Sequence, residues 1–76
     1  MIKVDITDCN IKFGEYIKTA RGRINMSQLE LANKTGISQS YLSYLESGDR
    51  SIDLTLALKL CEAVGMDLRD FINKHL

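Results

Sequence analysis

The 76-residue chain has no proline and no tryptophan, and it has no long hydrophobic run. Proline breaks helix interiors, so its absence together with 45% hydrophobic residues favours a compact helical chain over a disordered one. No apolar stretch approaches the roughly 20 residues of a membrane span, and no signal-peptide pattern is present, so we expect a cytoplasmic protein without membrane contacts. At this length the chain predicts one domain with one small core.

Cysteine and histidine are also scarce. Cys9 and Cys61 lie far apart with no CxxC pair, and His75 is the one histidine. This spacing excludes the common structural zinc sites, and it predicts two reduced thiols with no metal or other cofactor. The chain also lacks a nucleophile–base pair and a glycine-rich phosphate loop, which predicts that it is not an enzyme and has no small-molecule ligand.

The chain has no net charge, because ten basic residues balance ten acidic ones. A zero balance argues at first against a nucleic-acid partner. The distribution is uneven, however, since residues 10–51 contain six basic and four acidic residues. Any attraction to phosphates should therefore be modest and easily weakened by salt.

Helix start and stop signals divide the chain after residue 9 into five helical segments. The start signals are capping side chains: Asp8 or Asn10, then Ser27 with Glu30 as a capping box, Ser38, Asp53 and Asp67. The stop signals are residues that tolerate a left-handed backbone: Asn25, Gly36, Gly48 and Gly65. Phe13, Ile17, Ala20 and Ile24 form the predicted core stripe of the first helix.

Residues 1–9 give a weaker pattern. Ile2, Val4 and Ile6 alternate with polar residues, as in a short strand, but a flexible tail fits equally well. An edge strand that pairs across a dimer is a third reading. We therefore expect residues 1–9 to be a tail or short strand and residues 10–76 to form the domain.

Only Gly36-Ile37-Ser38 separates the second helical segment from the third, so a sharp corner joins two short helices. Leu42 and Leu45 are expected in the core, which leaves an outer face of amides and hydroxyls on residues 39–47. These groups read base edges in the major groove, although an ordinary solvated surface can look the same.

The stretch MSQLELANKTGISQSYLSYLESG, residues 26–48, resembles the XRE family of helix-turn-helix proteins, which includes the lambda-type phage repressors and Cro. The similarity extends over roughly residues 11–71. It implies an all-α, lambda-repressor-like fold of five helices, with helix 39–47 in the major groove of duplex DNA. The shorter stretch SYLSYLE, residues 40–46, is similar to stand-alone controller proteins of restriction–modification systems.

The resemblance also implies roles for individual residues. The base-reading positions are Gln39, Ser40, Ser43 and Tyr44, and the DNA-backbone positions are Gln28, Ser38, Tyr41, Ser47 and Arg50. Arg21 and Glu46 correspond to an ion pair that ties the first helix to the third. Two departures, Asp49 and Ile52, indicate weaker backbone binding by each subunit.

The last two helices carry more apolar residues than one buried stripe needs. In residues 54–64, one stripe suits the core: Leu54, Ala57, Cys61 and Val64. The surplus predicts a homodimer interface made by Leu56, Leu60, Ala63, Ile72 and Leu76. In the alternative reading, the last helix of the same chain covers the second stripe.

These features predict a sequence-specific regulator of transcription, a repressor or dual regulator, that binds a near-palindromic operator as a homodimer. The alternative is a protein-interaction module, such as an antitoxin or co-regulator, that keeps the fold but acts through a protein partner. The zero net charge and Asp49 favour the alternative, whereas the uncharged outer face of helix 39–47 favours DNA.

Overall fold

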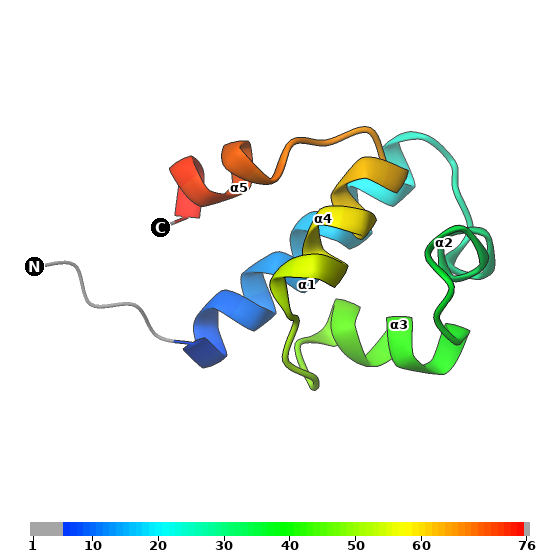
Figure 1. Ribbon diagram of the computed structural model, residues 1–76, viewed down its shortest axis with the longest axis horizontal. Helices are drawn as coiled ribbons and strands as arrows, with labels where there is room; N and C mark the ends of the chain where they lie inside the picture. Colours follow the sequence, from blue (N-terminus) through cyan, green and yellow to red (C-terminus); the bar gives the residue numbers. More distant parts are fainter. Residues whose placement is uncertain (1–5, 76) are drawn as a thin grey trace, which may run out of the picture.

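The computed structural model describes residues 6–75, and this part of the chain forms five helices and no strand. They are α1 (Ile6–Arg23), α2 (Gln28–Thr35), α3 (Gln39–Ser47), α4 (Leu54–Ala63) and α5 (Leu68–His75). Figure 1 shows α1 and α4 through the middle of the molecule, α2 and α3 toward one end, and α5 at the other. The prediction of an all-α, five-helix fold is confirmed. None of the described helices is both long enough and apolar enough to span a membrane.

Most of the predicted helix boundaries are confirmed. The Ser27 hydroxyl accepts from the Glu30 amide at 3.0 Å, and the Glu30 carboxylate accepts from the Ser27 amide at 3.1 Å, which completes the capping box. The side chains of Ser38 and Asp53 cap α3 and α4 by accepting from the amides of Tyr41 and Leu56. Asn25, with φ 53°, follows α1 in the left-handed conformation predicted for it.

The start of α1 differs from the prediction. The helix begins at Ile6, so Asp8 lies in its first turn and Asn10 lies inside it. Ile6 is therefore helical, while Ile2 and Val4 lie outside the described residues. Asn10 does not cap the helix but holds the α3–α4 loop, since its carbonyl oxygen accepts from the Ile52 amide at 3.3 Å.

One hydrophobic core lies where the helices meet, and all five helices contribute to it. Its buried members are Phe13, Ile17, Ala20, Leu31, Ala32, Leu42, Leu45, Leu56, Ala57, Leu60, Cys61, Val64 and Phe71. The ring of Phe71 packs edge-on against Phe13 at a centroid distance of 5.2 Å, which fixes α5 against α1. Ile24 was expected in the core but is 50% exposed, because it falls in the turn after α1.

The helix α1 crosses α3 at very close range, and Gly14 is the residue that permits it. A β-carbon at position 14 would meet the backbone oxygens of Leu45 and Glu46, the second at 2.6 Å. Glycine inside a helix costs about 1 kcal/mol relative to alanine, so its use here reflects this contact. The glycine therefore allows the backbone of α3 to lie directly against α1.

The apolar stripes of α4 are arranged differently from the prediction. Leu56 and Leu60 are 9% and 1% exposed, so they belong to the chain's own core and are not available to a partner subunit. The reason is that α4 packs against both α2 and α5, and it therefore buries two sides. Leu54, predicted to be in the core, is instead 68% exposed.

The other residues predicted at a dimer interface have mixed outcomes. Ala63 is partly buried against the core, whereas Ile72 is 41% exposed. Leu76 lies outside the described residues. The exposed apolar side chains of this region are thus Leu54, Leu58 and Ile72.

Candidate nucleic-acid interface

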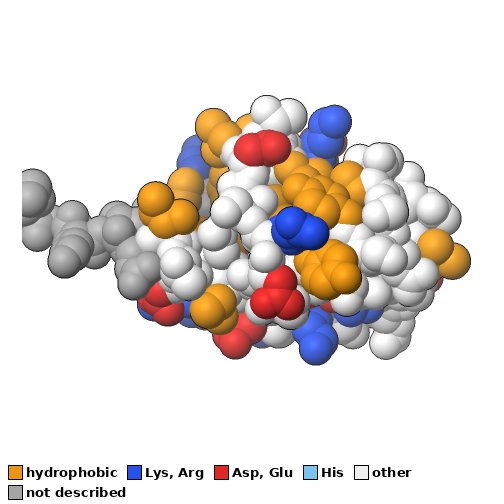
Figure 2. Space-filling model, turned by 90° about the horizontal axis from the view of Figure 1, so that it is seen from below, with side chains coloured by type: hydrophobic (Ala, Val, Ile, Leu, Met, Phe, Trp, Pro, Cys, Tyr) orange, Lys and Arg blue, Asp and Glu red, His pale blue; other side chains and the backbone are white. Residues whose placement is uncertain are grey.

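The outer face of α3 is polar, uncharged and open to solvent. Gln39, Ser40, Ser43 and Tyr44 are all exposed, and together with Gln28 they line a shallow depression. Figure 2 looks at the molecule from below, the side on which α3 lies in Figure 1. It shows a mainly uncharged surface with a basic side chain set among hydrophobic ones near the centre. The hydroxyl and amide groups on this face can both donate and accept hydrogen bonds.

The predicted ion pair between Arg21 and Glu46 is present and buried. The Arg21 Nε and terminal nitrogen donate to the two oxygens of Glu46 at 2.9 and 3.0 Å, a bidentate arrangement. The side chains are 16% and 4% exposed, so water screens the pair only weakly. Arg21 also donates to the Met26 carbonyl at 3.0 Å. One guanidinium therefore joins α1, the turn before α2, and α3.

Gln28 connects this buried pair to the exposed face. Its Nε2 donates to Glu46 Oε1 at 3.0 Å, and its Oε1 accepts from Gln39 Nε2 at 3.5 Å. The side chains of Arg21, Glu46, Gln28 and Gln39 thus form one chain of hydrogen bonds. This chain runs from the inside of the molecule to the first residue of α3.

The C-terminal end of the face is formed by α3 and the loop after it. The Arg50 guanidinium lies over the Tyr44 ring, 5.3 Å from its centroid, in a cation–π contact. Ser47 Oγ lies 2.9 Å from Asp49 Oδ2 and 3.1 Å from the Tyr44 carbonyl, so its hydroxyl is engaged within the protein. The loop therefore places one basic side chain, Arg50, and one acidic side chain, Asp49, beside the C-terminal end of α3.

Ser38 and Tyr41, the other residues predicted to contact the DNA backbone, have structural roles as well. The Ser38 oxygen accepts from the Tyr41 amide at 3.0 Å, which leaves its proton available to a further acceptor. Tyr41 is half-buried and its ring packs against the core. Ser38 thus caps the N-terminal turn of α3, and Tyr41 attaches that turn to the core.

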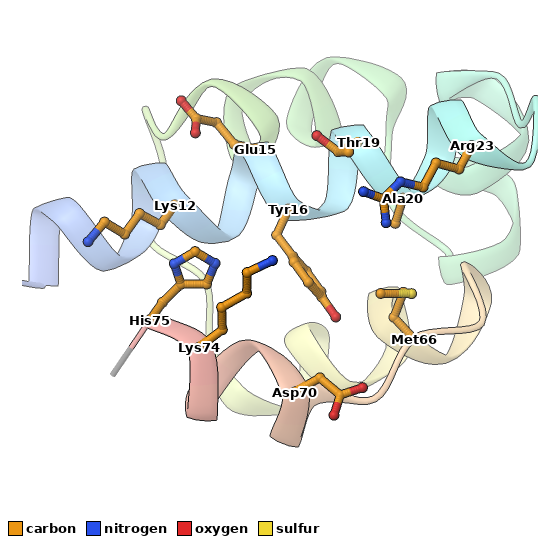
Figure 3. Close-up of a pocket in the computed structure, with 10 residues that line it drawn as sticks. All are labelled: Lys12, Glu15, Tyr16, Thr19, Ala20, Arg23, Met66, Asp70, Lys74 and His75. Atoms are coloured by element: carbon orange, nitrogen blue, oxygen red, sulfur yellow. The ribbon is translucent and has the colours of Figure 1, made fainter.

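A second depression, of about 310 Å³, lies between α1 and α5 (Figure 3). Tyr16 points from α1 toward α5 across it, and burial raises the pKa of its phenol. The lining mixes basic side chains, such as Lys74, with acidic ones, such as Asp70. Among the described residues, no three His, Cys, Asp or Glu side chains lie close enough together to hold a metal ion.

Sequence reasoning missed two residues that position the site. Gly14 sets the α1–α3 crossing, and a glycine within a strong helical pattern was the available signal. Asn10 was read as a cap, and no local pattern reveals its bond to a loop 42 residues away. The contact of Arg50 with Tyr44 also depends on how the loop folds back.

Comparison with known proteins gives a consistent result. Residues 17–71 match the model of a helix-turn-helix family. The chain is 35% identical over 54 residues to YgzD of Bacillus subtilis, described as an uncharacterized HTH-type transcriptional regulator, covering 71% of this chain and 82% of the relative. It is 31% identical over 62 residues to the control protein C.BamHI of Bacillus amyloliquefaciens, covering 80% and 76%.

Solved structures agree with these relatives. The restriction–modification controller protein C.AhdI of Aeromonas hydrophila matches with a TM-score of 0.76 and 33% identity, covering 83% of this chain and 94% of that one. The clp gene regulator ClgR of C. glutamicum matches with a TM-score of 0.81 and 26% identity, covering 87% and 86%.

The matched family and these relatives are regulators of transcription, which agrees with the prediction that the chain is not an enzyme. The match covers α2 and α3 completely and includes Arg21 and Glu46. The chain therefore belongs to the helix-turn-helix family of XRE-type, DNA-binding transcriptional regulators.

Proposed function

We propose that this regulator recognises a specific duplex sequence by inserting α3 into the major groove. The observation that carries the proposal is the outer face of α3, whose uncharged hydrogen-bonding groups are exposed while its other side is buried. Gln39, Ser40, Ser43 and Tyr44 contact base edges in this account. A major groove about 12 Å wide admits one helix and offers a distinct donor and acceptor pattern at each base pair.

A second set of side chains contacts the DNA backbone. Gln28, Ser38 and Tyr41 are proposed to bind phosphates beside the N-terminus of α3, where unpaired amides favour anions. Arg50 binds a phosphate beyond the C-terminus of α3. Ser47 was expected in this set, but its engaged hydroxyl makes it a weaker donor than the others. With Asp49 close to Arg50, the electrostatic contribution of each subunit is small.

Titration of fluorescent duplexes at low and at high salt distinguishes contacts to the bases from contacts to the DNA backbone. Gln39→Ala should relax the preference at one base pair by about 1–3 kcal/mol and leave the salt dependence unchanged. Arg50→Ala should weaken binding to every sequence alike and flatten the salt dependence. If the wild-type protein binds no duplex even at low salt, the proposal is wrong, and the protein-partner alternative is favoured.

The weak electrostatics of one subunit favour a homodimer, which presents two α3 helices to the two halves of a near-palindromic site about 34 Å apart. The apolar side chains left exposed near the C-terminus support an interface through α4 and α5. Leu58 is 52% exposed on α4, and Ile72 is 41% exposed on α5. Ile72 belongs to the interface predicted from the sequence, whereas Leu58 takes the place of Leu56 and Leu60, which are used in the core.

Sedimentation velocity tests the homodimer. The wild-type protein should sediment as a dimer at high micromolar concentration, and Leu58→Glu with Ile72→Glu should sediment as a monomer. Leu29→Glu is a matched control, because Leu29 is a leucine of equal exposure, 52%, on α2. A monomeric wild-type protein, or a control that dissociates as readily as the double variant, would contradict this interface.

A further inference from the structure

We infer that Asn10 is a positioning residue for binding of the DNA backbone, because it holds the α3–α4 loop that presents Arg50. This inference rests on the proposed function, since it concerns how the proposed phosphate contact of Arg50 is kept in place. Asn10 precedes residues 17–71, the part of the chain that matches the helix-turn-helix family. The inference therefore gives a DNA-binding role to a helix end that lies outside that match.

Asn10 makes two contacts with the loop, one from each side of its side-chain amide. Its Oδ1 accepts from the backbone amide of Ile52 at 3.3 Å, and its Nδ2 donates to Ser51 Oγ at 3.4 Å. The Ile52 N–H can only donate, so it takes the oxygen of Asn10 and leaves the NH2 group for the Ser51 hydroxyl. Asparagine is a poor residue for a helix interior, and at this half-buried position its amide bonds to the loop.

A second contact with α1 holds the start of the same loop. Gly48 lies against Ile11, since a β-carbon at position 48 would be 2.7 Å from Ile11 Cγ1 and 2.9 Å from Ile11 Cα. The loop is therefore attached to α1 at Gly48 and again at residues 51–52. Asp49 and Arg50, which are both exposed, lie between these two attachments.

Arg50 depends on this attachment because a phosphate contact is stronger when the group that makes it is already in place. The Arg50 guanidinium lies over the Tyr44 ring, 5.3 Å from its centroid. The loop backbone held by Asn10 and the ring on α3 thus place the positive charge together. A loop released from α1 would have to be ordered when DNA binds, and this ordering would lower the affinity.

The test is a double-variant cycle, in which the full chain is titrated at low salt with a fluorescent duplex that the wild-type protein binds. Asn10→Ala preserves α1, because alanine is the best helix former, and it should weaken binding by about three- to tenfold. In the Arg50→Ala background the same change should weaken binding by less than about twofold, because the contact that Asn10 supports is already absent.

Asn33→Ala is the matched control, since Asn33 is an exposed asparagine on α2. It should leave the affinity unchanged in both backgrounds. Equal losses from Asn10→Ala in the two backgrounds overturn the inference, because Asn10 would then act through its own contact with DNA or through the stability of the whole domain. An Asn10→Ala protein that binds as tightly as the wild type overturns it as well.

A second measurement needs no DNA. In the free protein, NMR should find that the Ile52 amide proton exchanges with solvent about three- to tenfold more slowly in the wild type than in Asn10→Ala. The side-chain protons of Arg50 should show an upfield ring-current shift from Tyr44, and Asn10→Ala should reduce this shift.

The two measurements distinguish failure of the inference from failure of the proposed function. An unchanged exchange rate or an unchanged ring-current shift in Asn10→Ala overturns the inference and leaves the proposed function intact. A wild-type protein that binds no duplex at low salt overturns the proposed function, and the inference with it.

Discussion

Replacing Glu46 with alanine should destabilise the protein far more than any exposed charge would. The carboxylate accepts from Arg21 twice and from Gln28 once, at 2.9 to 3.0 Å, and its side chain is 4% exposed. Removing it leaves the Arg21 guanidinium, 16% exposed, without its partner. Loss of one member of a buried pair costs about 3–5 kcal/mol.

The size of this loss is easily measured. A domain of this length shifts its melting temperature by about 4–8 °C per kcal/mol, so Glu46→Ala should melt at least about 12 °C below the wild type. Circular dichroism at 222 nm during heating and in urea would record it. The double variant Arg21→Met with Glu46→Leu should recover much of the loss, because two apolar side chains leave no buried charge unpaired.

Lys12→Ala is the control for the buried pair. It removes the pair between Lys12 and Asp8, whose nitrogen and oxygen are 2.9 Å apart but whose side chains are 42% and 55% exposed. An exposed pair of this kind contributes about 0.3–0.5 kcal/mol, so the melting temperature should fall by only a few degrees. A shift for Glu46→Ala that is no larger than that for Lys12→Ala would refute the reasoning.

Two further predictions concern the core. Gly14→Ala should lower the free energy of unfolding by about 1–3 kcal/mol, because its methyl group would meet the backbone of α3, whereas Gly22→Ala, with no atom within 4 Å, should not destabilise. Urea unfolding of both variants checks this, and equal stability would count against the close crossing. Burial raises the pKa of Cys61 from 9.0 to about 11, so the stability it contributes is complete below pH 9 and is lost as the pH rises toward 11. Cys61→Ala should therefore lose less stability than the wild type between pH 8.5 and pH 10.5. If the free energy of unfolding falls equally with pH in both proteins, the raised pKa of Cys61 is contradicted.

Local signals were sufficient to predict most of the fold. Ser27 with Glu30, Ser38 and Asp53 each act through neighbours three residues away, so their caps can be read from the sequence alone. The start of α1 was not predicted, because a capping residue such as Asp8 is equally acceptable in the first turn of a helix.

The errors in α4 have a different origin. A helical periodicity tells which residues share a face, but it does not tell how many faces are covered. Leu56 and Leu60 appeared to be surplus because the sequence gives no sign that α4 packs against both α2 and α5. Leu56 is buried and Leu54 is exposed because of how α4 packs against these two helices.

In the candidate site, too, some features could be predicted from the sequence and others depend on how the helices pack. Arg21 and Glu46 were paired through a family resemblance, and the structure contains that pair. The connection from Glu46 through Gln28 to Gln39 depends on three side chains from two different helices. Distances of this kind appear only once the helices are packed, with Gly14 letting α3 lie close to α1 and Arg21 bonded to the turn before α2.

Selection of bound duplexes from a random pool tests the central claim most directly, with the full chain at low salt followed by sequencing of the enriched population. The account predicts an enriched motif of two inverted half-sites whose centres are about one helical turn apart, with an adenine that Gln39→Ala no longer selects. A pool that stays random after repeated rounds, or an enriched motif that is unchanged in Gln39→Ala, would contradict the assignment of α3 as the reading helix.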